Sequence, residues 1–215
     1  MAADLPTLRE RKKERTRETL IATALRLFSE KGFGGTTLDE LCAEAEVSKR
    51  TFFRYFASKE DVAMAPTQDI WAVFLEDLAA RDPGGRTVLE MLQGCLCDAL
   101  TRMDSVGWAE QARVSSVLAG TTPSIEAHSL YFCDRTCRTA LDILHRRFDL
   151  GGPHDLRARL ALDILVATFH RALETWVAMP GTTTTSDLVA ATETAFAAVP
   201  GAYTLPARSA VADVG

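Results

Sequence analysis

A series of helix-capping residues between positions 37 and 58 constrains the fold of this 215-residue chain more than any other feature. Thr37-Leu38-Asp39-Glu40 has the S/T-x-x-E form of a capping box, in which side-chain oxygens satisfy the free N–H groups at a helix start. Ser48 and Ser58 can each cap a further helix in the same way. Two short helices, 38–45 and 49–56, are therefore expected on either side of a tight turn.

Helical periodicity covers most of the remaining sequence. Apolar residues recur at helical spacing from 9 to 31, and Gly32 follows as a glycine cap. Further helices are expected over 59–80, 86–104, 108–119, 123–149, 154–179 and 186–199, between breaks rich in Gly, Pro and Thr. Because no segment alternates in the manner of a strand, the sequence predicts an all-α protein.

The order of these segments predicts the domain organisation. A long helix followed by two short ones joined by a tight turn is a helix-turn-helix arrangement. We expect an N-terminal three-helix DNA-binding domain over residues 1–60 and a helical bundle over 61–200. The segment 201–215 has no periodicity and is expected to form a loose tail.

The distribution of charge supports a polyanionic partner for the N-terminal unit. The chain has a net charge of −5, yet residues 1–60 carry 12 basic and 10 acidic residues and include all five lysines. The remaining residues carry 12 basic and 19 acidic ones. Such a split indicates that the first unit meets a polyanion and the second does not.

The start of the second short helix carries side chains suited to DNA. The beginning of a recognition helix is the end that enters the major groove. Lys49 or Arg50 can donate hydrogen bonds to guanine, and Thr51 can meet a thymine methyl or a phosphate. Lys59, at the start of the next helix, is placed to contact the DNA backbone.

Four aromatic residues follow within five positions, and they cannot all point the same way on a helix. Phe52 and Phe56 share a face and are expected in the core. Phe53 and Tyr55 point elsewhere and are available to a phosphate surface. For Tyr55, packing and DNA contact are both open.

The segment "TTLDELCAEAEVSKRTFFRYFASKED" resembles the DNA-binding domain of TetR-family repressors, and the upstream "LIATALRLFSEKGFGG" resembles that family's first helix and connection. The resemblance covers about residues 15–65 without a gap, and beyond it extends only to length and helical pattern. It implies an all-α dimer that binds operator DNA. Its phosphate and base contacts fall on Thr37, Ser48, Lys49, Arg50, Thr51, Phe53, Tyr55 and Lys59.

Two positions depart from the family pattern. Phe53 stands where the family usually has Tyr, which removes a phenolic hydrogen bond to phosphate. Glu46 replaces the usual turn glycine, and a left-handed backbone there costs a non-glycine residue on the order of 1 kcal/mol. Both departures predict weaker or more selective DNA binding.

The resemblance also implies how the C-terminal part works. In the family, the last two helices form a four-helix dimer interface, here near 156–179 and 186–199. A small-molecule effector in the bundle releases DNA, and similarity to actinobacterial members favours a hydrophobic one. Large or soft residues that could line its cavity, with Arg113 and His170 as polar candidates, are Trp71, Phe74, Met91, Cys95, Met103, Trp108, Arg113, Tyr131, Phe132, Phe169 and His170.

Other functions remain open at this stage. Core packing is the alternative for each candidate cavity residue, and a bundle that binds a protein partner is the alternative to a small-molecule effector. Cys133 and Cys137 share a helical face and could bind a metal or sense oxidation. An enzyme would have His170 and Glu174 as its acid–base pair, but no catalytic or cofactor motif accompanies them, so we expect no enzyme, cofactor or metal.

The sequence also predicts where the protein acts. The N-terminal segment is polar, with no apolar signal core, and no run approaches the roughly 20 apolar residues of a membrane span. Five cysteines without a disulfide framework fit a reducing compartment. We expect a cytoplasmic protein.

Overall fold

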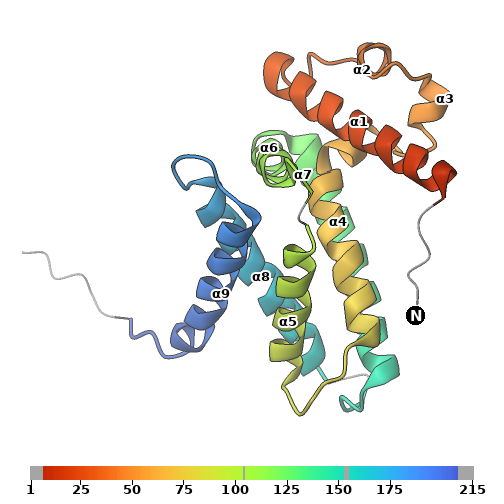
Figure 1. The fold of residues 1–215 in the computed structure, drawn as a ribbon. Coiled ribbons are helices and arrows are strands. Elements are labelled where there is room, and N and C mark those ends of the chain that lie inside the picture. Colours follow the sequence, from red (N-terminus) through yellow and green to blue (C-terminus); the bar gives the residue numbers. More distant parts are fainter. Residues whose placement is uncertain (1–6, 104, 153–154, 208–215) are drawn as a thin grey trace, which may run out of the picture.

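The computed structural model describes residues 7–103, 105–152 and 155–207, and the regular structure in them is entirely helical (Figure 1). The predicted all-α fold, with an N-terminal helix-turn-helix unit and a C-terminal helical domain, is confirmed. In chain order the helices are α1 Leu8–Lys31, α2 Leu38–Glu44, α3 Lys49–Phe52, α4 Lys59–Ala80, α5 Val88–Thr101, α6 Trp108–Thr121, α7 Pro123–Arg147, α8 Arg157–Val177 and α9 Thr185–Ala202.

The predicted caps begin the helices of the N-terminal unit. The Thr37 hydroxyl accepts a hydrogen bond from the Glu40 amide at 3.1 Å, and Ser48 accepts one from the Thr51 amide at 3.0 Å. Ser58 accepts from the Asp61 amide at 3.2 Å. Each cap satisfies an amide that the first turn leaves without a helical partner.

Helix α3 is shorter than predicted. The sequence predicts a helix over 49–56, but regular α-helix ends at Phe52. After Phe53, two amides pair with carbonyls three residues back: Arg54 with Thr51 at 3.2 Å and Tyr55 with Phe52 at 2.8 Å. This tighter 3₁₀-type winding replaces the last turn of the predicted helix.

Helix α9 runs further than predicted. It continues through Pro200 to Ala202, so the first two residues of the expected loose tail are helical. Because proline has no N–H, α9 lacks the hydrogen bond from position 200 to the carbonyl four residues before it. Residues 203–207 form no further helix, and 208–215 lie outside the described residues.

Two apolar clusters organise the packing. The C-terminal cluster joins α4, α5, α6, α7, α8 and α9 around fully buried side chains such as Phe74, Leu96 and Trp176. The N-terminal cluster contains the buried residues of α1, α2 and α3 and the first turns of α4, but also Leu118 of α6 and Ile125 of α7. The cluster of the N-terminal unit therefore extends into the bundle, so the two parts are packed together rather than joined only by a linker.

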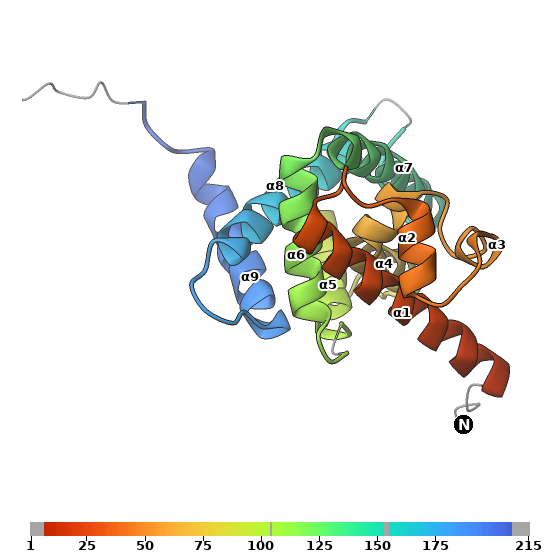
Figure 2. The ribbon, with the colours of Figure 1, turned by 90° about the horizontal axis from the view of Figure 1, so that it is seen from above.

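The views show how the N-terminal unit sits on the bundle. Helices α1–α3 lie at one end of α4, which continues into the bundle, while α8 and α9 lie on the side away from α3 (Figures 1 and 2). A bidentate pair from Arg17 of α1 to Asp69 of α4, at 2.7 and 2.9 Å, joins the two parts. Within the described residues, no helix is both long and apolar enough to cross a membrane.

Candidate functional site

The start of α3 presents the side chains predicted to read DNA. Lys49 and Arg50 are exposed, and Thr51 is half-buried. The Ser48 and Thr51 hydroxyl oxygens lie 3.0 Å apart, so part of their hydrogen-bonding capacity is used within the cap. The Lys49 ammonium pairs with Asp39 of α2 at 2.7 Å. Lys49 must therefore break its ion pair with Asp39 before its ammonium group can contact DNA.

The aromatic residues divide as the sequence predicts. Phe52 and Phe56 are buried in the N-terminal cluster. The side chain of Phe53 is 55% exposed and packs edge-on against Phe52. Tyr55 is half-buried against the same cluster, with the Arg54 guanidinium 5.3 Å from its ring centre. Packing accounts for most of the Tyr55 ring, and Phe53 is the aromatic residue open to a partner.

Lys59, predicted to contact the DNA backbone, makes contacts within the protein. Its ammonium donates hydrogen bonds to the carbonyl oxygens of Phe33 at 3.1 Å and Thr36 at 2.6 Å, and it lies 4.5 Å from the Phe33 ring centre. Carbonyl dipoles and an aromatic face both stabilise a cation. Lys59 therefore joins the α1–α2 connection to the start of α4.

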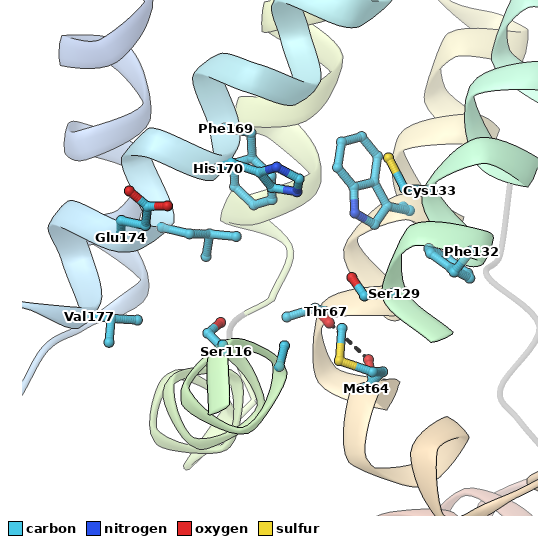
Figure 3. Close-up of a pocket in the computed structure, with 14 residues that line it drawn as sticks. Met64, Thr67, Ser116, Ser129, Phe132, Cys133, Phe169, His170, Glu174 and Val177 are labelled. Atoms are coloured by element: carbon cyan, nitrogen blue, oxygen red, sulfur yellow. Dashed lines mark hydrogen bonds between the residues drawn. The ribbon is translucent and has the colours of Figure 1, made fainter. Parts of the chain in front are cut away.

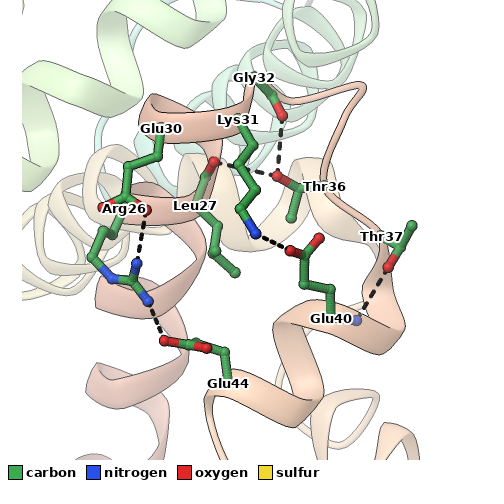
Figure 4. Close-up of polar contacts among 9 residues, drawn as sticks. All are labelled: Arg26, Leu27, Glu30, Lys31, Gly32, Thr36, Thr37, Glu40 and Glu44. Atoms are coloured by element: carbon green, nitrogen blue, oxygen red, sulfur yellow. Dashed lines mark hydrogen bonds and ion pairs between the residues drawn. The ribbon is translucent and has the colours of Figure 1, made fainter.

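Polar contacts between α1 and α2 fix the angle of the helix-turn-helix unit (Figure 4). Arg26 pairs with Glu30 at 2.9 Å and with Glu44 of α2 at 2.6 Å, and Lys31 pairs with Glu40. In addition, the buried Thr36 hydroxyl donates to the Gly32 carbonyl at 3.1 Å. The ion pairs are exposed and individually weak, so the apolar cluster supplies most of the stability.

Glu46 adopts the left-handed backbone that the departure from glycine predicts. Its φ is 52°, and it is the one non-glycine residue with positive φ in the described part of the chain. Its side chain also helps to line a surface groove of about 630 Å³ between the first turns of α1 and the turn before α3. Arg11, Lys12 and Arg15 line the same groove, so Glu46 offsets part of a basic surface.

We expect Glu46→Gly to raise the free energy of unfolding by about 0.5–1 kcal/mol, because it removes left-handed strain at some cost in chain entropy. Glu46→Ala removes the charge but keeps the strain and should not stabilise the protein. Chemical denaturation of the three proteins measures the difference. Equal stabilisation by alanine would show that charge, not backbone conformation, makes position 46 unfavourable.

A cavity of about 300 Å³ opens between α4, α6, α7 and α8 (Figure 3). It is lined by Met64, Thr67, Trp71, Ser116, Ala119, Gly120, Ser129, Phe132, Cys133, Phe169, His170, Leu173, Glu174 and Val177. The volume is at the lower end of the range for small-molecule sites. Apolar side chains with a few hydroxyl, imidazole and carboxylate groups suit a small, largely hydrophobic ligand.

Four of the predicted cavity residues line this space: Trp71, Phe132, Phe169 and His170. Trp71 forms the centre of an aromatic group, with its ring edge-to-face against Phe169 at 5.5 Å and against Phe74 at 5.4 Å. Aromatic residues on α4, α7 and α8 therefore meet at one place, although they lie far apart in the sequence.

The other seven predicted residues do not line the cavity. Phe74, Met91 and Cys95 are buried in the C-terminal cluster, and Met103 packs against it. The remaining three residues have other contacts or none. Trp108 donates from Nε1 to the Pro66 carbonyl at 3.2 Å, and Tyr131 is exposed. The Nε of Arg113 lies 3.6 Å from a carboxylate oxygen of Glu110, and its guanidinium donates to the Val177 carbonyl at 3.5 Å. Size and softness alone cannot separate cavity residues from core or surface residues.

The cavity residues that the sequence did not indicate are mostly small or polar. On α6, Ser116, Ala119 and Gly120 follow one another at helical spacing and leave space where larger side chains would fill it. On α8, His170, Leu173, Glu174 and Val177 form one helical stripe toward the cavity. That stripe is a readable sequence signal, but only once a neighbouring helix is known to face it.

His170 is the titratable residue of the predicted set that faces the cavity. Desolvation by the surrounding protein, with a smaller contribution from Arg171, lowers its pKa below the ordinary value, while Glu174 opposes the shift. The imidazole is therefore predominantly neutral at pH 7 and can both donate and accept a hydrogen bond.

The cavity and the DNA-binding unit share residues. Met64 of α4 lines the cavity and belongs to the N-terminal cluster. Ala119 of α6 also lines the cavity and packs against that cluster, and the adjacent Leu118 is buried in it. A ligand that displaced α4 or α6 would therefore change the packing beneath α1–α3.

Comparison with known proteins agrees with this arrangement. Residues 20–65 match the model of the bacterial regulatory proteins of the tetR family. The match covers the helix-turn-helix unit and the first turns of α4. All eight positions predicted to contact DNA lie within the matched residues.

Part of the chain is also similar to a known transcriptional regulator. The chain is 44% identical over 98 residues to the transcriptional regulator TcmR of Streptomyces glaucescens, which is 46% of this chain and 43% of that protein. The match to this relative thus spans less than half of its length.

Solved structures extend the likeness in fold to most of the chain. A TetR-family regulator from Syntrophomonas wolfei superposes with a TM-score of 0.59 at 19% identity, over 90% of this chain and 99% of that one. The TetR-family repressor FadR of Thermus thermophilus, solved with lauroyl-CoA, has a TM-score of 0.50 at 24% identity over 93% and 100% of the chains. These similarities show a shared fold.

Proposed function

We propose that this chain is a member of the TetR family and a homodimeric transcriptional repressor that binds a palindromic operator through α3 and is released by a small hydrophobic effector. The observation that carries the proposal is the wall shared by the cavity and the N-terminal cluster. As a regulator of chromosomal DNA it would act in the cytoplasm.

The exposed residues of α3 support DNA binding at this helix. Lys49, Arg50 and Phe53 project from a segment held by the buried Phe52 and Phe56. A fixed scaffold beneath flexible basic side chains suits major-groove readout, because phosphates set the register while base edges supply specificity.

The packing of α4 and α6 supports coupling to an effector. Met64 contacts both the cavity and the N-terminal cluster, and the buried Ser115 hydroxyl of α6 lies 3.8 Å from its sulfur. An effector that binds more tightly when α4 and α6 move apart would shift the population toward a conformation with a different spacing of the two α3 helices.

The lining of the cavity supports a hydrophobic effector. Trp71, Phe132, Phe169 and Leu173 supply apolar area, while His170 and Glu174 can orient a polar group. The lauroyl-CoA complex of FadR, which shares the fold, is consistent with a ligand that carries an apolar chain.

The outer faces of α8 and α9 support a homodimer. On α8, Leu156, just before the helix, and Leu160 are exposed large apolar residues. On α9 the exposed positions are mostly small, with Ala190, Thr194, Ala197 and Ala198 along one side. Small side chains permit close helix approach, so these faces fit a four-helix interface with a second copy.

We expect Ala197→Glu to convert the dimer to a monomer, because two copies of a buried carboxylate would face the interface without a partner. Light scattering after size-exclusion chromatography measures the mass. Leu130→Glu places the same charge at an exposed position of α7, outside the proposed interface helices, and should remain dimeric. A dimeric Ala197→Glu protein would place the interface elsewhere.

An operator-release screen tests the proposed function as a whole. Labelled DNA from around the protein's own gene should be shifted at low salt, and a subset of small apolar compounds should reverse the shift. Absence of any shift would contradict the repressor proposal. A stable shift that no compound reverses would favour a protein partner at the bundle instead.

A further inference from the structure

A second hollow adjoins the effector cavity. It has a volume of about 390 Å³ and lies between α4 and α7, and we call it the α4–α7 groove. Trp71 of α4 and Phe132 of α7 line both spaces, so their side chains form the partition between them. Both rings are half-buried. Rotation of the Phe132 ring out of the partition would join the groove to the cavity.

The α4–α7 groove carries a positive charge close to this partition. Arg135 lines the groove, and its guanidinium carbon lies 5.8 Å from the Phe132 ring centre. Asp69 also lines the groove, but it is engaged by Arg17 of α1 through hydrogen bonds of 2.7 and 2.9 Å. Among the described residues, no carboxylate lies within ion-pair distance of Arg135. Its charge is therefore uncompensated beside an apolar cavity.

Thr136 adds a hydrogen-bonding group to the groove. Only 7% of this residue is exposed, and it lines the groove directly after Arg135. A threonine within a helix commonly donates to a carbonyl of the preceding turn, as Thr139 does to the Arg135 carbonyl at 3.1 Å. The Thr136 hydroxyl makes no hydrogen bond to any described residue, and since no fully buried side-chain oxygen there lacks a partner, its oxygen is open to the groove. The hydroxyl is therefore available to a ligand.

The cavity and the groove suit different parts of a molecule. In the cavity, Phe132 and Phe169 favour apolar atoms. The charged residue of its described lining is Glu174, which pairs with Arg171 of the same helix at 2.6 Å, so an anion finds no unpaired cation there. In the groove, the planar guanidinium of Arg135 matches the two oxygens of a carboxylate.

We propose that the cavity and the α4–α7 groove form one binding site, the joined site, for an apolar molecule with an anionic group such as a carboxylate. The apolar part lies in the cavity, and the anion receives hydrogen bonds from the Arg135 guanidinium and the Thr136 hydroxyl. This inference rests on the proposed function, because it names the chemical class of the effector.

Two fluorescent dyes test the anionic end of the joined site. Anilinonaphthalene sulfonate is an apolar anion, and N-phenylnaphthylamine has the same ring system without the sulfonate. In fluorescence titrations of the full chain, Arg135→Gln should weaken binding of the anionic dye about 10-fold, because a hydrogen bond to a charged group is lost. Thr136→Val, which keeps the shape of the side chain, should weaken it about 3-fold. Neither variant should change the affinity for the neutral dye.

Arg138→Gln is the matched control for charge. Arg138 is also exposed on α7 but does not line the groove, and it pairs with Asp134 at 2.9 Å. This variant should leave the affinity for both dyes unchanged. An equal loss in Arg138→Gln would show that the anionic dye responds to surface charge in general. That result, or wild-type affinity for the anionic dye in Arg135→Gln, would overturn the proposal.

Gly120→Trp tests whether one molecule occupies both spaces. Gly120 lines the cavity but not the groove. An indole in the cavity should weaken binding of both dyes by at least about 10-fold, whereas Gly120→Ala should stay near wild-type affinity. Thermal melting verifies that the variants are folded. Loss of the anionic dye in Arg135→Gln without loss in Gly120→Trp would place that dye in the groove alone and overturn the joined site.

Competition tests the same point without a substitution. Naphthalene, which has no charge, should displace the anionic dye from the wild-type protein, because both occupy the cavity. Failure to compete would contradict the joined site.

The dye titrations contain no DNA, so failure of the joined site and failure of the repressor function are distinguishable. A protein that binds no operator would contradict the proposed function without affecting the joined site. A repressor whose affinity for the anionic dye is independent of Arg135 would overturn the joined site and leave the proposed function intact.

Discussion

Replacing Lys49 and Arg50 together by alanine should abolish specific operator binding and leave the dimer intact. Each base contact of this kind contributes about 1–3 kcal/mol, so the double variant should lose roughly 30-fold or more in affinity. Both side chains are exposed, and neither packs in the N-terminal cluster, so the fold should not change. Competition gel shifts with specific and random DNA measure the effect.

Two controls distinguish the loss of contacts to the DNA bases from a general loss of positive charge. Arg138→Ala with Arg146→Ala removes the same charge from the exposed surface of α7 and should leave specificity unchanged. Asp39→Asn removes the partner that holds Lys49 at 2.7 Å and should tighten binding. A monomeric Lys49→Ala, Arg50→Ala protein would mean that these residues serve assembly, not DNA.

Gly120→Trp should fill the cavity, so that the protein still binds its operator but is no longer released from it by the effector. Gly120 lines the cavity and a Cβ there meets no atom within 4 Å, so a side chain can be added at this position without a clash at its Cβ. The indole would occupy most of a space of about 300 Å³. We expect at least about a 10-fold increase in the effector concentration needed for release, the equivalent of about 1.4 kcal/mol.

Gly120→Ala is the matched control for this experiment. It also replaces glycine by a better helix former, a gain of up to about 1 kcal/mol, with only a methyl group at the cavity wall. The measurement is release of labelled operator by compounds that release the wild-type protein. Normal release of Gly120→Trp would place the effector outside this cavity.

Much of the N-terminal unit follows from its sequence because local interactions determine it. The hydroxyls of Thr37, Ser48 and Ser58 cap the helices that they precede. Phe52 and Phe56, spaced four residues apart, share one face, and both are buried in the core. Glu46 adopts positive φ because the turn requires that conformation whatever residue occupies it. Each of these features depends on residues within a few positions of one another.

The features that could not be predicted from the sequence depend on contacts between residues far apart in the chain. Lys59 binds the carbonyls of Phe33 and Thr36, and that choice becomes visible only when α1 and α4 are placed together. The cavity exists because Gly120 and Ala119 have small side chains that leave space unfilled. In a sequence, small residues at a cavity wall cannot be distinguished from small residues at a close contact between helices. Met91 and Phe74 were candidates for a ligand site because they are large and apolar, and the same properties place them in the core.

Footprinting on the operator is the most direct measurement of whether two copies of this chain read DNA together. Two α3 helices in a dimer should protect two symmetric half-sites with centres one helical turn apart, roughly 34–36 Å, or a multiple of that distance. Protection should disappear with Lys49→Ala and Arg50→Ala. A single unsymmetric footprint, or protection that persists in the double variant, would contradict recognition of a palindrome by α3.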